Sequence, residues 1–252
     1  LSCPLLELSP LWSTPVRQSL LRNVTHIEEC ECPLCDDVLL DNYRRYSTSL
    51  NCQCGSPLIA RPDHAVKEFA VLCSNDECER SSDLSETIRK FLCKFWTEYS
   101  LLYASGVFQR SGDGNMEEVA EKLKRLERLL ELGQKLLHSK DNAVLSEIRV
   151  DLLDHFKERA IKAASEKNGA ERDRCSQMYI QLLEGVHATC TGYGVCSPYS
   201  AKICTTLAYA YKEVRDKGNA KKYFREASEI WAKLYGPKHT YVEHCRHEAK
   251  YA

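Results

Sequence analysis

The sequence lacks the features that mark membrane and secreted proteins. No uninterrupted apolar run approaches the roughly 20 residues of a membrane-spanning helix. The N-terminus has no basic region, apolar stretch and small-residue cleavage site of the kind found in secretory signals. We therefore expect no membrane partner and a reducing, cytoplasmic or nuclear setting.

An excess of one charge is also missing, since 35 Lys and Arg side chains are offset by 36 Asp and Glu, for a formal net charge of −1. A nucleic-acid-binding surface needs a basic patch or stripe, whereas the cysteine-rich segment is acidic. We therefore do not expect direct nucleic-acid binding. The acidic residues of that segment are Asp36, Asp37, Asp41, Asp63, Glu68, Asp76, Glu77 and Glu79.

Familiar catalytic motifs are absent as well. The sequence contains no glycine-rich phosphate loop, no nucleophile elbow and no His-Glu-x2-His segment. The glycine-containing turn at residues 111–115 is too short and too isolated for a phosphate or calcium loop. We do not expect this chain by itself to turn over a substrate.

Cysteine, in contrast, is abundant, with 14 in the chain. Close spacing without a secretory signal favours zinc over disulfides. We expect the cysteines scattered through the helical-looking sequence to be buried, unreactive thiols; a disulfide between Cys190 and Cys196 is the alternative. The crowded cysteines are Cys30, Cys32, Cys35, Cys52, Cys54, Cys73 and Cys78.

The first group, Cys30, Cys32 and Cys35, offers three ligands to a metal that prefers four. With one residue between them, Cys30 and Cys32 can direct their side chains to the same side, and the two-residue spacing to Cys35 then turns the chain back toward them. The group cannot form a closed structural site by itself, so a fourth ligand has to come from elsewhere. The alternative is that only two of the three, or none, bind metal.

The second group, Cys52, Cys54, Cys73 and Cys78, resembles the two knuckles of a zinc ribbon, with Gly55 after the first pair. Each knuckle would donate two thiolates from a tight turn. We favour a zinc site made of these four cysteines.

This second group departs from a ribbon because Asn51 stands where the first cysteine is expected and Cys52 comes one residue late. In a competing pattern, Cys52 or Cys54 is shared with the first group. His26 and His64 are further candidate ligands, although a lone loop histidine more often faces solvent.

From residue 84 onward the sequence reads as helical. Residues 116–139 are strongly amphipathic, with alternating Glu and Lys on the flank of an apolar face. A coiled coil is the alternative, but the heptad does not persist past Gly133. The apolar face comprises Val119, Leu123, Leu126, Leu129, Leu130 and Leu136.

The last part of the chain repeats itself. Tyr-Gly recurs at Tyr193 and Tyr235, and Tyr199 then corresponds to Tyr241. Such self-similarity indicates stacked helix pairs, here with the small and aromatic residues of a tetratricopeptide (TPR) unit. We therefore expect a mainly α fold, with a TPR-like helical-repeat array preceded by a small loop-rich cysteine region; an irregular helical bundle is the alternative. The expected contact residues are Leu207, Ala208 and Tyr211 on one helix and Ala220, Phe224 and Ala227 on the next.

An open cysteine triplet, a ribbon-like insert and a helical-repeat tail follow one another in this chain. That order resembles the C-terminal half of the SET and MYND domain-containing lysine methyltransferases, the SMYD family, and above all members with an extra cysteine module after the triplet. The resemblance is carried by "LWST" at 11–14, Arg17, Gln18, Leu20 or Leu21, His26, the triplet with Asp36, and "LYGPKHTYV" at 234–242.

The resemblance implies that Cys30, Cys32 and Cys35 form the post-SET zinc site, whose fourth thiolate comes from the SET body. That body binds S-adenosylmethionine and closes a lysine channel with a tyrosine, but its signature segments are not found here. The chain begins at Leu1, so we expect it to be part of a longer protein and assign no catalytic residue. The family also places an aromatic two residues before the triplet, where this chain has Glu28.

By this resemblance the chain divides into the end of a SET-like region at 1–29, a post-SET-like segment at 30–49, a zinc-ribbon-like module at 50–83 and a TPR-like domain at 84–252. It would be the C-terminal portion of an S-adenosylmethionine-dependent protein-lysine N-methyltransferase, completing the cofactor and substrate cleft and binding protein partners, with the catalytic SET core absent from this chain. Its partners would be histone or other lysine substrates, or chaperone-like and other peptides. The alternative is a non-catalytic zinc-binding TPR-like adaptor.

We predict that this chain alone does not bind S-adenosylmethionine, because the SET pocket is not among its recognisable segments. Isothermal titration calorimetry of the zinc-loaded chain should give no binding heat. Saturable binding would contradict the prediction.

Overall fold

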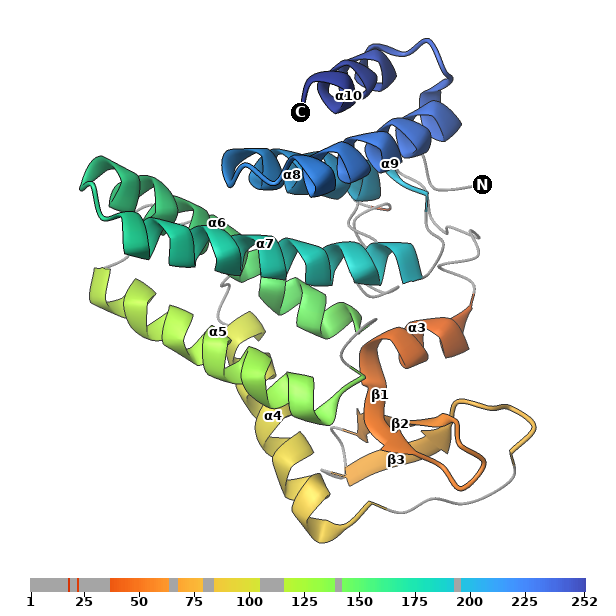
Figure 1. Ribbon diagram of the computed structural model, residues 1–252. Helices are drawn as coiled ribbons and strands as arrows, with labels where there is room; N and C mark the ends of the chain where they lie inside the picture. The colour runs from red at the N-terminus through yellow and green to blue at the C-terminus, as the bar shows by residue number, and fades with distance from the viewer. Residues whose placement is uncertain are drawn as a thin grey trace. The chain divides into compact units, whose positions relative to one another are not determined.

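The computed structural model describes residues 37–63, 68–78, 84–104, 116–138, 142–192 and 196–252, together with Gln18 and Arg22. These residues are mainly helical, with one small three-stranded sheet (Figure 1). A cysteine cluster precedes helices α4–α10 in the chain, and the predicted fold class is confirmed. They divide into two compact units, one formed by Val38–Ile148 and the other containing Arg149–Ala252. Among the described helices, none has both the length and the apolar character needed to cross a lipid bilayer.

The sheet of the first unit has three antiparallel strands in the order β1, β2, β3. Its central strand supplies the apolar core, because Leu58, Ile59 and Ala60 are at most 4% exposed. The register pairs Asn51 with Pro57 and Leu58 with Cys73, so the β1–β2 turn and the end of β3 lie at one end of the sheet. The strands are β1 (Ser47–Asn51), β2 (Pro57–Asp63) and β3 (Glu68–Cys73).

The outer edge of β1 is covered by the chain that leaves α5. Leu137 forms a β-bridge with Thr48, and the His138 N–H donates to the Ser47 carbonyl over 3.0 Å. The Ser49 hydroxyl donates to the Lys135 carbonyl at the last turn of α5 over 2.9 Å. The helices of this unit are α3 (Val38–Tyr46), α4 (Glu86–Ala104), α5 (Met116–Leu136) and the first part of α6 (Ala143–Ser165).

A buried polar network joins α3, α4 and α6 within this unit. Arg45 Nη1 donates to Glu147 Oε1 over 2.9 Å, and the Tyr99 hydroxyl donates to Glu147 Oε2 over 2.5 Å. Burial, followed by the nearby Glu147 charge, raises the Tyr99 pKa well above its ordinary value, so the phenol remains a donor. Asn142 caps α6 by accepting the N–H groups of Val144 and Leu145.

The predicted apolar face of α5 is confirmed. Leu126, Leu129 and Leu130 are buried, and Leu123 and Leu136 are half-buried. This face packs inside its own unit, where α5 contacts α4 and β1. The Val119 side chain lies outside the described residues.

The second unit contains the consecutive helices that the repeat pattern predicted. α7 packs on α8, α8 on α9, and α9 on α10. The predicted contact residues are all buried, with Leu207, Ala208 and Phe224 completely so. Small alanines between aromatic side chains thus let neighbouring helices approach closely. The helices are α7 (Gly169–Gly192), α8 (Pro198–Glu213), α9 (Lys217–Tyr235) and α10 (Thr240–Tyr251), after the second part of α6.

Local capping sets the boundary between α8 and α9. The Asp216 carboxylate accepts the Asn219 N–H over 3.0 Å, which starts α9 at Lys217. Arg215, with φ of 64°, reverses the chain just before this cap. The turn therefore falls before Gly218, which lies in the first turn of α9, because the aspartate cap sets the helix boundary.

We predict that Gly133→Ala destabilises the first unit. A Cβ at Gly133 would lie 2.5 Å from Leu145 Cδ2 and 2.7 Å from Phe95 Cε2, and both side chains are fully buried. Overpacking of this kind costs about 1–3 kcal/mol, against the roughly 1 kcal/mol that alanine gains in a helix. Denaturant titration should show a lower free energy of unfolding.

The matched control is Gly169→Ala at the start of α7, where an added Cβ meets nothing within 4 Å. Its free energy of unfolding should be equal to or slightly above that of the original chain. Equal stability of the two variants would contradict the close packing described at Gly133.

Candidate metal site of four cysteines

The first two cysteines of the site lie in the turn between β1 and β2. The Cys52 N–H donates to the Ser56 carbonyl and the Gly55 N–H to the Cys52 carbonyl, each over 2.8 Å. Gly55 has φ of +89°, a conformation that favours glycine. This tight turn lets Cys52 and Cys54 present their sulfur atoms on the same side.

The other two cysteines flank the turn that follows β3. Cys73 is the last residue of that strand, and the next N–H, from Ser74, donates to the Pro57 carbonyl over 3.0 Å. The Cys78 N–H then donates to the Asn75 carbonyl over 3.0 Å. The second turn is therefore held against the first at the same end of the sheet.

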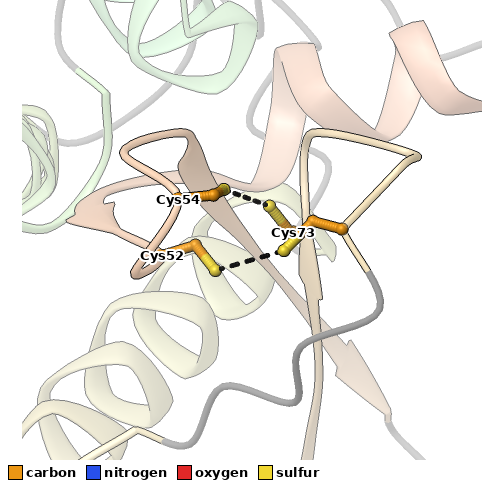
Figure 2. Close-up of side chains that lie close together, drawn as sticks. Cys52, Cys54 and Cys73 are labelled. Atoms are coloured by element: carbon orange, nitrogen blue, oxygen red, sulfur yellow. Dashed lines mark hydrogen bonds between the residues drawn. The ribbon is translucent and has the colours of Figure 1, made fainter.

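The two turns bring the four predicted thiols together. Their sulfur atoms all lie within 4.8 Å of one another. The Sγ–Sγ distance is 3.4 Å between Cys54 and Cys73 and 3.7 Å between Cys52 and Cys78. Figure 2 shows Cys52, Cys54 and Cys73 pointing toward one another from the two turns. Four sulfurs at this separation are compatible with tetrahedral zinc, and a closed set of four thiolates is typical of structural sites.

The thiols differ in acidity because they share hydrogen bonds. The Ser56 N–H and hydroxyl, followed by the Cys73 thiol, lower the Cys54 pKa to about 6. The Asn75 N–H stabilises the Cys73 thiolate, but burial and hydrogen bonds with the other three thiols outweigh it and raise the Cys73 pKa to about 12. The Cys54 sulfur is therefore ready to act as a ligand at neutral pH, whereas a bound cation would have to favour deprotonation of Cys73.

The remaining predicted ligands fall outside the described residues. These are Cys30, Cys32 and Cys35, together with His26 and His64. A separate site at the triplet, and the pattern in which it shares Cys52 or Cys54, both stay predictions.

The scattered cysteines behave largely as predicted. Cys175, Cys190, Cys204 and Cys245 are buried, whereas Cys93 is exposed on α4. No disulfide joins Cys190 and Cys196, so the alternative of a disulfide between them is wrong for this structure.

Sequence reasoning missed a second group of ligand-type side chains. His187, Cys204 and Glu226 place one nitrogen, one sulfur and one carboxylate oxygen within 4.8 Å of one another. Each comes from a different helix, so no short motif signals the group. Only an assignment of the facing sides of α7, α8 and α9 could have found it.

Comparison with known proteins adds no assignment. No protein-family model matches the chain, and no curated protein matches it.

We predict that Cys54 in metal-free protein reacts with iodoacetamide at unusually low pH. Because its pKa is lowered to about 6, the alkylation rate should stay high at neutral pH and fall to half near pH 6. An ordinary thiol, with a pKa of about 8.5, is mostly protonated by then. Peptide mass mapping over a pH series would measure the midpoint at Cys54.

Ser56→Ala is the matched variant, since it removes the hydroxyl that lowers the Cys54 pKa but keeps the backbone N–H. Its midpoint should move upward. A midpoint near 8.5 in the original chain would contradict the hydrogen bonding described for Cys54.

Proposed function

We propose that this chain is the zinc-stapled, partner-binding C-terminal portion of a SET- and MYND-type protein-lysine methyltransferase. The observation that carries the proposal is the convergence of Cys52, Cys54, Cys73 and Cys78 at one end of a small sheet. A cysteine module of this kind, ahead of TPR-like helices, is what the resemblance to the SMYD family implies.

Zinc is the metal best suited to the cysteine cluster. Four thiolates in a tetrahedral set select zinc or iron–sulfur centres over hard cations such as calcium and magnesium. The set leaves no open coordination position, so the metal would hold the two turns together without taking part in catalysis. Its binding would stabilise a segment whose apolar core is small.

We predict that Cys73→Ser weakens zinc binding at this cluster by at least about tenfold, because it removes one of four ligands. Competition with a chromophoric chelator would measure the affinity. Cys93→Ser is the control, since Cys93 is exposed on α4 and outside the cluster. It should bind zinc as the original chain does, and equal affinity in both variants would refute the zinc assignment.

Methyl transfer would belong to the longer protein. In the family, the SET body supplies the S-adenosylmethionine pocket and the lysine channel, and the post-SET triplet completes them. By that resemblance, Cys30, Cys32 and Cys35 of this chain would receive their fourth zinc ligand from the SET body. The helices of the second unit would then cover the cleft and select partners, a role suited to the curved surface of stacked helix pairs.

We predict that this chain gains methyltransferase activity only together with the preceding part of its own transcript. The test is transfer of a radiolabelled methyl group from S-adenosylmethionine to core histones, followed by lysine mapping. The chain alone should give no transfer, whereas the extended protein should give transfer that depends on its SET tyrosine. An extended protein that folds and binds zinc but neither binds S-adenosylmethionine nor methylates would contradict the proposal.

One observation favours the adaptor as a second candidate. The second unit contains a hollow of about 1000 Å³ lined from α6, α7 and α8. It mixes apolar and charged groups, among them Ile161, Arg172 and Tyr209. Such a surface suits an extended peptide whether or not the longer protein is an enzyme, so a folded but inactive extended protein would favour this function.

A further inference from the structure

Three side chains that can bind metal meet inside the second unit, and none of them belongs to the four-cysteine cluster. His187 belongs to α7, Cys204 to α8 and Glu226 to α9, three helices that follow one another along the chain (Figure 1). Their ligand atoms all lie within 4.8 Å of one another. His187 Nε2 and Glu226 Oε1 are 2.7 Å apart.

The burial of the three residues forms a gradient from the core to solvent. Cys204 is 0% exposed, whereas the side chains of His187 and Glu226 are 15% and 29% exposed. The sulfur therefore lies at the inner end and the carboxylate nearest to water. Glu226 is therefore the member of the group that solvent reaches most readily.

Packing fixes the orientation of the histidine ring. The Tyr223 ring stands edge-on to it, with centroids 5.2 Å apart and an interplanar angle of 84°. Tyr223 in turn stacks on Tyr211, whose hydroxyl donates to Glu184. Surrounding groups of this kind orient ligands in metal sites. They leave the His187 ring nitrogen directed at Glu226.

The distances suit a small tetrahedral ion. Metal–ligand bonds of about 2.0–2.3 Å place neighbouring ligand atoms roughly 3.3–3.8 Å apart. The His187–Glu226 pair, at 2.7 Å, is closer than that value, and the other pairs of the group lie within 4.8 Å. Small side-chain rotations would therefore be enough, with the three helices in place.

We propose that His187, Cys204 and Glu226 bind a divalent cation of the zinc class. One thiolate, one imidazole and one carboxylate form a mixed set that zinc accepts and that calcium and magnesium do not favour. The Cys204 proton passes to solvent as the sulfur–metal bond forms. The fourth position faces the exposed side of Glu226 and takes a water molecule, so the ion connects α7, α8 and α9.

When no metal is bound, polar groups of the same side chains form hydrogen bonds with one another. The His187 ring hydrogen-bonds to Glu226 and, with its charge, lowers the pKa of that carboxyl group, while burial raises the pKa of the Cys204 thiol. The unit can therefore fold before it binds the ion. A hydrogen-bonded cluster that never binds metal is the alternative, and the experiment below separates the two.

Glu226→Gln is the most informative variant. The amide oxygen can still accept a hydrogen bond from His187, but the anionic ligand is lost. Glu229→Gln is the control, because Glu229 is an exposed residue on the same helix and outside the group. Native mass spectrometry of the folded full chain, after equilibration with zinc and a competing chelator, counts the ions bound to each variant.

We expect Glu226→Gln to hold one zinc fewer than the original chain, with an affinity at this position lower by at least about tenfold. Glu229→Gln should hold the same number as the original chain. Equal zinc content in all three proteins would overturn the proposal and identify a purely hydrogen-bonded cluster.

The Cys73→Ser variant keeps this result separate from the four-cysteine site. Combined with Glu226→Gln, it should remove two zinc ions if both sites bind independently. If the double variant loses a single ion and Cys73→Ser alone loses the same one, the four-cysteine site is supported. That result would refute the site at His187, Cys204 and Glu226.

Discussion

Four thiols within 4.8 Å of one another are the constraint on which the cysteine-bearing end of the small sheet depends. Several thiolates at this distance repel one another unless a cation lies between them. Hydrogen bonds from Ser56 favour the Cys54 thiolate, whereas burial and the neighbouring thiols keep Cys73 protonated. Apolar burial offers the sheet little other stabilisation, since its buried apolar residues are mainly Leu58, Ile59 and Ala60 of β2. A metal held by the cluster would supply stability that so small a core does not provide.

The cysteine cluster was predictable because its signal is local. Each knuckle is a short turn that contributes two ligands, so two cysteines that are close in sequence are also close in the folded chain. The late position of Cys52, which departs from a regular ribbon, is accommodated by the turn at Gly55. The covering of β1 by Leu137 and His138 was not predictable, because it joins segments far apart in sequence and depends on backbone hydrogen bonds that any residue can make.

The helices were predictable for a similar reason. The helical period of apolar residues and the spacing of alanine and aromatic residues are both visible within one short segment of sequence. The complete burial of Ala220, Phe224 and Ala227 follows directly from that pattern. The assembly of His187, Cys204 and Glu226 does not, because a single histidine or glutamate on a helix carries no sign of what faces it. The prediction that Cys204 is a buried, small core residue is confirmed. That prediction did not say which ligand-type side chains lie beside it.

The closed edge of β1 has a consequence for association between chains. An uncovered edge strand offers free N–H and C=O groups to any extended peptide, and such edges promote aggregation. Leu137 and His138 already occupy that position along β1, and β2 is enclosed between its neighbours. Among the described residues, no strand or bridge pairs with the outer edge of β3, so a foreign strand would extend this sheet more readily there, next to the exposed Leu72.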